Sequence, residues 1–124
     1  MYQLGAKSNK RLEGVHPDLV AVVRKAIEIS EQDFTVLEGL RSIERQKELV
    51  ASGKSTTMNS RHLTGHAVDI SPWPISWDWD YFYPIAEAMK EAAKELNVDI
   101  EWGGDWKRFP DGPHFQLSWK DYPK

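Results

Sequence analysis

Two long amphipathic segments alternate along the chain with short β-prone runs, and this pattern limits the folds open to it. Apolar residues recur at helical spacing over 17–30 and again over 81–96, so both segments are predicted helices. Pro17 and Pro84 suit the first turns of these helices, where a missing amide proton costs least. Asp80 is expected to cap the second helix.

A third, shorter helix and four strands complete the expected elements. Ser42 resembles a helix N-cap, and a helix is predicted from there to about Ala51, before Gly53. Strands are predicted at 34–37, 67–70, 98–102 and 114–119. We therefore expect an α+β fold, with a small, mainly antiparallel sheet packed against about three helices. The 124 residues suit a single domain over 1–124 with no appended binding module.

The composition excludes several classes of protein. Cysteine is absent, which rules out disulfide scaffolds, iron–sulfur clusters and thiolate zinc fingers, so any metal must be held by His, Asp or Glu. The net charge of −3 disfavours a broad surface for nucleic acid or for stable membrane binding. The sequence shows neither a signal-peptide core nor a membrane span, so we expect a soluble protein outside the general secretory route.

The densest set of potential metal ligands lies in Ser-Arg-His-Leu-Thr-Gly-His-Ala-Val-Asp, residues 60–69. His62 ends a loop and Asp69 lies on the next predicted strand, and a turn at Gly65 can bring them together. Imidazole and carboxylate groups bind Zn²⁺, and a catalytic zinc site needs three protein ligands plus an open position. His114, which opens the last strand, is the candidate third ligand.

One acidic residue and two further histidines need to be assigned as catalytic, metal-binding or neither. Asp111 stands three residues before His114, a spacing that can put its carboxylate beside a metal-bound water as a general base. His66 follows His62 by four residues, but the nearby glycine and β-prone run argue against a helix, so we expect a loop residue and not a ligand. His16 precedes a helix and is expected to be solvated.

Several separated motifs, taken together, resemble the LAS zinc peptidases of peptidoglycan. The first is Ser-x-His-x-x-Gly-x-Ala-x-Asp, and the second is an acidic residue just before a histidine near the C-terminus. The run Glu-Trp-Gly-Gly-Asp-Trp at 101–106 and the segment around Arg41 and Gln46 look like the L-alanyl-D-glutamate endopeptidase branch, which includes phage endolysins. The resemblance covers about residues 5 to 118 and implies a hedgehog/D-Ala-D-Ala peptidase-like fold.

The resemblance implies a role for each matching residue. His62, Asp69 and His114 would hold one Zn²⁺. Asp111 would serve as base and proton shuttle, and Arg41 would steady the oxyanion.

Further residues would bind or orient the substrate. Ser60 and Gln46 would orient the substrate or the groups around it, and Trp102 and Trp106 would form walls of the groove. The remaining tryptophans are expected to be packing residues: Trp73, Trp77, Trp79 and Trp119.

The resemblance implies a zinc metallopeptidase that hydrolyses the L-Ala–D-Glu bond of peptidoglycan stem peptides. A compact phage endolysin would be made in the host cytoplasm, would reach the wall after a holin opens the membrane, and would act as a monomer. One alternative is a D-Ala-D-Ala carboxypeptidase or dipeptidase, because these enzymes share the zinc motifs. A second alternative is a zinc-stabilised wall-binding module that has lost catalysis, which the presence of Asp111 and Arg41 disfavours.

Overall fold

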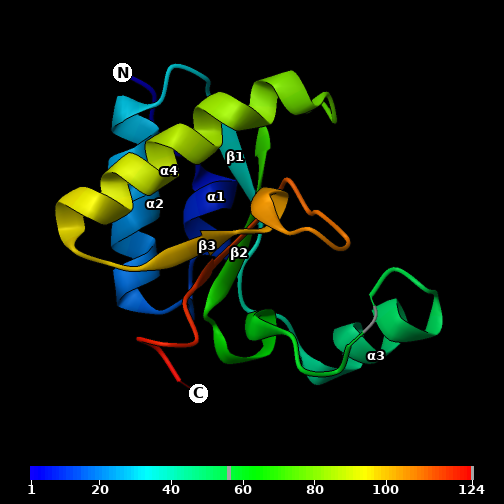
Figure 1. The fold of residues 1–124 in the computed structure, drawn as a ribbon. Coiled ribbons are helices and arrows are strands. Elements are labelled where there is room, and N and C mark those ends of the chain that lie inside the picture. The colour runs from blue at the N-terminus through cyan, green and yellow to red at the C-terminus, as the bar shows by residue number, and fades with distance from the viewer. Residues whose placement is uncertain (56, 124) are drawn as a thin grey trace.

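A computed structural model describes residues 1–55 and 57–123, and Figure 1 shows their elements. The α-helices of these residues are α1 (Ala6–Arg11), α2 (Pro17–Ile29), α3 (Ile43–Ala51) and α4 (Phe82–Leu96). The strands are β1 (Phe34–Glu38), β2 (Ala67–Pro72), β3 (Ile100–Trp102) and β4 (His114–Leu117), with short 3-10 helices at Arg61–Thr64, Trp79–Tyr81 and Gly103–Asp105. No helix in the described ranges combines the length and apolarity needed to cross a membrane.

The strands form one sheet in the order β1-β2-β4-β3, and each neighbouring pair is antiparallel. This confirms the predicted α+β class with a small antiparallel sheet. In the central pair, Asp69 of β2 lies opposite His114 of β4. The two residues predicted as ligands on separate strands are therefore direct cross-strand neighbours.

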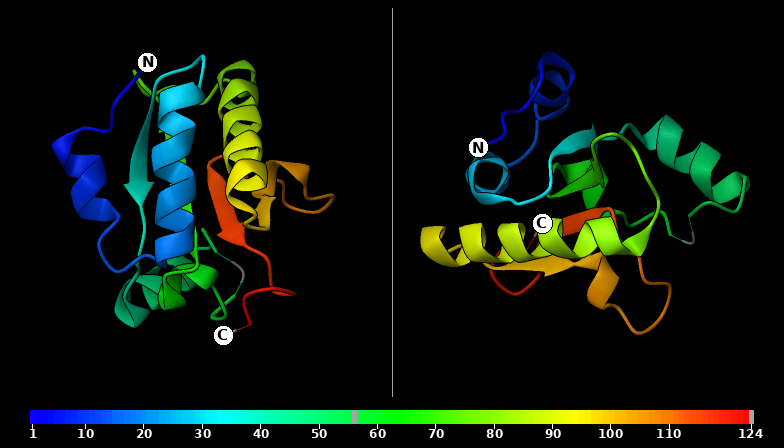
Figure 2. Two further views of the ribbon diagram at one scale, coloured as in Figure 1. Left: turned by 90° about the vertical axis from the view of Figure 1, so that its left-hand side faces the viewer. Right: turned by 90° about the horizontal axis from the view of Figure 1, so that it is seen from above.

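One face of the sheet packs on the hydrophobic core. Alternate residues of the central strands point into it, because side chains of a strand alternate between its two faces. These residues are Val68 and Ile70 on β2, and Phe115 and Leu117 on β4. Helices α2 and α4 lie side by side over this face and contribute their apolar stripes (Figure 2). Asp69 and His114 alternate with these residues along their strands and therefore lie on the opposite face of the sheet.

Helix α1 covers the outer edge of the sheet at β1. Ser8 Oγ accepts a hydrogen bond from Val36 N–H (3.0 Å), and the Arg11 guanidinium donates to the Val36 carbonyl (3.0 Å). These contacts satisfy backbone groups that an edge strand would otherwise leave unpaired. The sequence prediction omitted this helix because its six residues, Ala-Lys-Ser-Asn-Lys-Arg, carry no apolar stripe.

Most predicted helix ends are confirmed. Pro17 is the first residue of α2, and Ser42 Oγ caps α3 by accepting from Arg45 N–H. The helix predicted over 81–96 is α4, and Asn97 ends it in the left-handed conformation with φ of 57°. The predicted Asp80 cap is wrong. The carboxylate that caps this region is Asp78, which accepts from Asp80 N–H at the start of the 3-10 turn that leads into α4.

Candidate active site

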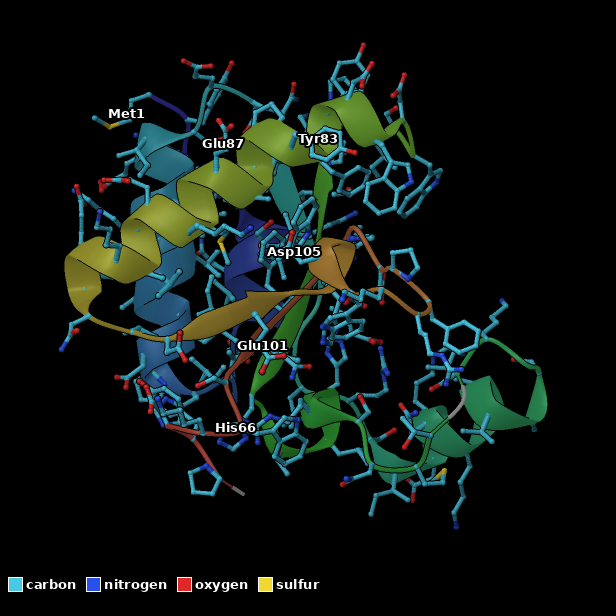
Figure 3. All side chains as sticks on the ribbon, viewed as in Figure 1. Met1, His66, Tyr83, Glu87, Glu101 and Asp105 are labelled. Carbon is cyan, nitrogen blue, oxygen red and sulfur yellow. The ribbon has the colours of Figure 1, made fainter. Side chains whose placement is uncertain are left out.

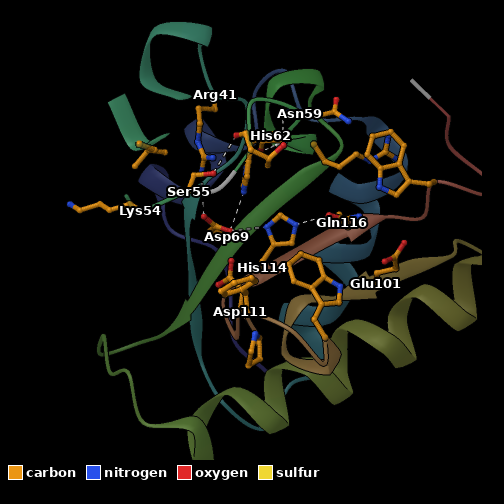
Figure 4. Close-up of a pocket in the computed structure, with 18 of the residues that line it drawn as sticks. Arg41, Lys54, Ser55, Asn59, His62, Asp69, Glu101, Asp111, His114 and Gln116 are labelled. Carbon is orange, nitrogen blue, oxygen red and sulfur yellow. Dashed lines mark hydrogen bonds and ion pairs between the residues drawn. The ribbon is translucent and has the colours of Figure 1, made fainter. Parts of the chain in front are cut away.

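Three side chains from separate elements meet on the exposed side of the sheet (Figure 4). His62 comes from the 3-10 turn before β2, Asp69 from the middle of β2 and His114 from the start of β4. Asp69 Oδ1 lies 3.1 Å from His62 Nε2 and 3.3 Å from His114 Nδ1. One donor atom from each of the three residues lies within 4.8 Å of the others, so the cluster can hold a metal ion.

The turn between His62 and Asp69 depends on Gly65. Gly65 has φ of 74°, and a Cβ placed there would lie 2.4 Å from the Gly14 carbonyl oxygen. At the start of the same turn, Ser60 Oγ accepts a hydrogen bond from His62 N–H (3.2 Å). Glycine is the residue that fits this backbone conformation and this close approach. The predicted turn is thus present, and Ser60 holds its first residues in place.

Each histidine is oriented by a second hydrogen bond on its other ring nitrogen. His62 Nδ1 donates to the Gly39 carbonyl at 2.8 Å, and His114 Nε2 donates to Gln116 Oε1 at 2.8 Å. In the neutral rings, His62 therefore presents an unprotonated Nε2, and His114 an unprotonated Nδ1, toward Asp69. Partners of this kind fix the tautomer and orientation of metal-binding histidines.

The electrostatics of the cluster favour a charged carboxylate. Burial alone would raise the pKa of Asp69, but the hydrogen bonds that protonated His114 and His62 rings donate to it, and then their positive charges, hold it well below its usual value. Burial would lower the pKa of His114, yet its hydrogen bond to Asp69 and the charge of that carboxylate raise it. Asp69 is therefore an anionic donor flanked by two imidazoles, a combination that suits a divalent cation.

Asp111 lies beside the cluster at the end of the loop that precedes β4 (Figure 4). Its backbone N–H donates to the Gly103 carbonyl (2.9 Å), which ties this loop to the turn after β3. Burial raises the pKa of the Asp111 carboxyl, and repulsion from Asp69 raises it further, while the nearby histidines and Arg41 oppose the shift. A carboxyl with a raised pKa is better matched to proton exchange than an ordinary aspartate.

Arg41 reaches the same cluster from the segment between β1 and α3. Its guanidinium is paired with the Glu38 carboxylate, and its Nη2 lies 3.7 Å from Asp69 Oδ2. Its Nη1 donates to Gln46 Oε1 at 2.7 Å. Its backbone N–H also donates to the His62 carbonyl (3.0 Å), so Arg41 and His62 are positioned together.

Gln46 and Trp102, predicted to orient the substrate or its surroundings and to wall the groove, are both buried. Gln46 is fully buried, and its amide nitrogen donates to Ser55 Oγ (2.9 Å) and to the Thr57 carbonyl (2.5 Å). Its amide oxygen is therefore held in place to accept the hydrogen bond from Arg41 Nη1. Trp102 is 6% exposed, stacks on Phe115 of the core and donates its indole N–H to a backbone carbonyl, because its side chain points to the core side of β3.

The cluster lies in an open groove of about 1000 Å³. Both Ser60 and Trp106 line it, and the Trp106 ring lies 5.1 Å from the His114 ring. Sequence reasoning did not assign other groove residues: Lys54, Asn59, Arg61, Glu101, Phe109 and Gln116. For Gln116 a signal existed, since it lies two residues after His114 and therefore on the same face of the strand. The contact between His62 Nδ1 and the Gly39 carbonyl could not be predicted, because a backbone carbonyl is present at every residue and leaves no mark in the sequence.

The tryptophans predicted as packing residues are largely exposed. Trp73, Trp77 and Trp79 are 53%, 63% and 39% exposed. Trp119 is also exposed; it lines the groove and covers the Arg61 guanidinium, whose carbon lies 3.9 Å from its ring centroid. These side chains lie where the chain is irregular, so no periodic pattern assigned them to the core or the surface.

The fold and the cluster together define a small α+β domain with a candidate metal centre and a neighbouring acid in one groove. A sequence model of the family described as phage L-alanyl-D-glutamate peptidase matches residues 1–119. The chain belongs to this family, as its motifs predicted.

Individual relatives agree with this assignment. The L-alanyl-D-glutamate peptidase of Escherichia phage T5 is 34% identical over 89% of this chain and 85% of its own length. That of Listeria phage A118 is 38% identical over 82% of this chain, which spans 37% of that relative. The crystal structure of Serratia marcescens L-Ala D-Glu endopeptidase ChiX superposes with a TM-score of 0.92 at 54% identity, covering 96% of this chain and 92% of that one.

Proposed function

We propose that this protein is a zinc-dependent endopeptidase that hydrolyses the L-Ala–D-Glu bond of peptidoglycan stem peptides. One observation carries the proposal: His62, Asp69 and His114 converge in the groove that also holds Asp111. The activities for which the phage relatives and ChiX are named support the choice of bond. A third relative, the peptidoglycan endopeptidase CwlK of Bacillus subtilis, is 31% identical over 68% of this chain, which spans 60% of it.

The donor set supports zinc as the metal. Two imidazoles and one carboxylate, with no thiolate, match catalytic zinc sites that keep one position open. The donor atoms already lie near one another, since Asp69 Oδ1 is 3.1 Å from His62 Nε2 and 3.3 Å from His114 Nδ1. A bound Zn²⁺ would act as a Lewis acid on the peptide carbonyl and would make an attacking water more acidic.

The proton transfers fall to Asp111. Its carboxylate takes a proton from the attacking water and, once protonated, delivers that proton to the amine of the departing D-Glu residue. The raised pKa of Asp111 suits both steps, because a group with a pKa nearer the working pH can accept and release a proton readily.

Arg41 is proposed to stabilise the oxyanion that forms as water adds to the carbonyl. Glu38 and Gln46 hold its guanidinium against the cluster before the substrate binds, so little reorganisation is needed during the reaction. One such donor is typically worth about 3–4 kcal/mol in the transition state. Ser60 and Trp106 are proposed to help position the substrate along the groove walls.

Digestion of purified murein sacculi tests this function directly. Mass spectrometry of the soluble products should show stem peptides with a new D-Glu N-terminus and glycan that retains L-Ala. Release of terminal D-Ala instead would identify a carboxypeptidase. Binding to sacculi without any cleavage would identify a wall-binding module. The role in host lysis stays a prediction, which release of such fragments during phage growth would test.

A further inference from the structure

Exposed aromatic and apolar side chains are concentrated in the segment 73–83, which we call the aromatic ridge. Its members are each 39–63% exposed: Trp73, Ile75, Trp77, Trp79, Tyr81 and Tyr83. Figure 3 shows Tyr83 near the start of α4, beside a group of aromatic side chains. Contiguous clusters of exposed apolar side chains are typical of binding surfaces.

The rings of the ridge are held by packing beneath them. Trp77 stacks on Phe82 with an interplanar angle of 17° and a centroid distance of 6.3 Å, and Trp79 lies 6.2 Å from the buried Trp102. The backbone is anchored as well, because Trp73 N–H donates to the Asp33 carbonyl (2.9 Å). Rings fixed in this way lose little conformational freedom when a ligand binds.

The ridge borders the catalytic groove. A Cβ placed on Gly112 would lie 3.6 Å from the rings of both Trp79 and Phe82. Gly112 directly follows Asp111, which lines the groove together with Phe109 of the same loop. The ridge and the groove are therefore adjoining surfaces on two sides of one loop.

The charge of the ridge selects among ligands. The segment 73–83 carries Asp78 and Asp80 and no Lys or Arg, so it would be repelled by the anionic headgroups that attract basic membrane-binding segments. A neutral ligand rich in hydroxyl groups fits better. The faces of aromatic rings carry partial negative charge and attract the weakly positive C–H groups of a sugar ring. Carboxylates accept strong hydrogen bonds from hydroxyl groups.

We propose that the aromatic ridge binds the glycan strand of peptidoglycan while the attached stem peptide lies in the groove. This inference rests on the proposed function. In peptidoglycan, L-Ala is joined through a lactyl group to N-acetylmuramic acid, so the bond that is cut lies one residue from the glycan. One extended residue spans about 3.3–3.6 Å. The glycan must therefore pass close to Asp111, and the ridge adjoins the Asp111 loop where Trp79 lies against Gly112.

Binding to glycan strands stripped of their peptides tests the ridge independently of cleavage. Trp77→Ala should weaken co-sedimentation with these strands about 10-fold, which corresponds to about 1.4 kcal/mol, and Trp77→Tyr should restore most of it. Tyr2→Ala is the control, because Tyr2 is an exposed aromatic residue outside the ridge and follows Met1, which lies away from Tyr83 in Figure 3. Unchanged binding by Trp77→Ala, or an equal loss in Tyr2→Ala, would overturn the proposal.

Cleavage of two substrates separates this proposal from the proposed function. Trp77→Ala should raise KM for a disaccharide-linked stem peptide about 10-fold and leave kcat/KM for the sugar-free peptide unchanged. An equal loss on both substrates would show a structural effect and overturn glycan binding. Wild-type protein that binds glycan but cuts neither substrate would instead refute the endopeptidase. Ridge-dependent binding to lipid vesicles, or ridge-dependent self-association, without glycan binding would assign the ridge to a membrane or to a second copy.

Discussion

Asp69 and His114 face each other across the β2–β4 pair, and this single register relationship builds the centre of the candidate site. It puts Asp69 Oδ1 3.3 Å from His114 Nδ1, while Gly65 turns the chain so that His62 reaches the same oxygen. Two elements distant in sequence are thus joined by backbone pairing, which gives the cluster a rigid base.

The choice among the histidines can be tested by removing them one at a time. His114→Ala should lower both metal content and activity, because only two protein ligands would remain. His66→Ala should retain the metal, since His66 Nδ1 contacts Thr64 Oγ1 at 2.6 Å and the metal-binding cluster does not include this ring. Metal content by elemental analysis distinguishes the two variants. Loss of metal from His66→Ala alone would show that the wrong histidine was assigned.

Asp111→Asn should keep the metal and the fold but lower kcat by about 10²–10⁴-fold. The amide has nearly the same shape as the carboxyl and cannot accept the proton of water, so the loss should fall on kcat more than on KM. Circular dichroism, metal content and peptide hydrolysis are measured on one preparation. A variant with near wild-type kcat would place the base elsewhere in the groove, with Glu101 the next candidate.

Gln116→Leu should weaken metal binding about 10–100-fold while leaving the protein folded. The substitution removes the acceptor that holds His114 Nε2, and the similar volume of leucine preserves packing. Metal affinity by competition with a chelating dye gives the measurement. Gln116→Glu is the matched variant, because it keeps an acceptor at this position and should retain tighter binding than Gln116→Leu. Equal affinities of wild type and Gln116→Leu would contradict this role.

Gly65→Ala should destabilise the protein by at least about 1–2 kcal/mol, the cost of a left-handed conformation for a residue with a side chain. The new Cβ would also collide with the Gly14 carbonyl, and the turn that carries His62 would shift. Thermal unfolding measures the loss. Gly5→Ala is the control, because a Cβ there meets nothing within 4 Å. A Tm for Gly65→Ala equal to that of the control would show that the turn is not under this constraint.

The sequence was informative where chemistry and periodicity act locally. Alternation along β2 separates Asp69 from its buried neighbours Val68 and Ile70, and the spacing around Gly65 indicates the turn. The motifs predicted the family, which the comparisons confirm.

Features set by tertiary packing could not be predicted in the same way. Gln46 is polar and lies on a predicted helix, yet it is buried, because it forms hydrogen bonds with Arg41, Ser55 and Thr57. Trp102 and Trp77 are equally aromatic in the sequence, but one is buried and the other exposed because only Trp102 lies on a strand beside the core. Helix α1 escaped prediction because its contacts with β1 are made by polar side chains.

The most direct test of the account is to measure zinc content and murein hydrolysis on the same protein before and after chelation. The cluster of His62, Asp69 and His114 predicts close to one equivalent of zinc in the purified protein. Activity should be lost as zinc is removed and should return when one equivalent is added back, with circular dichroism verifying the fold at each stage. Full hydrolysis in a strong chelator, by protein that contains no zinc, would contradict the central claim.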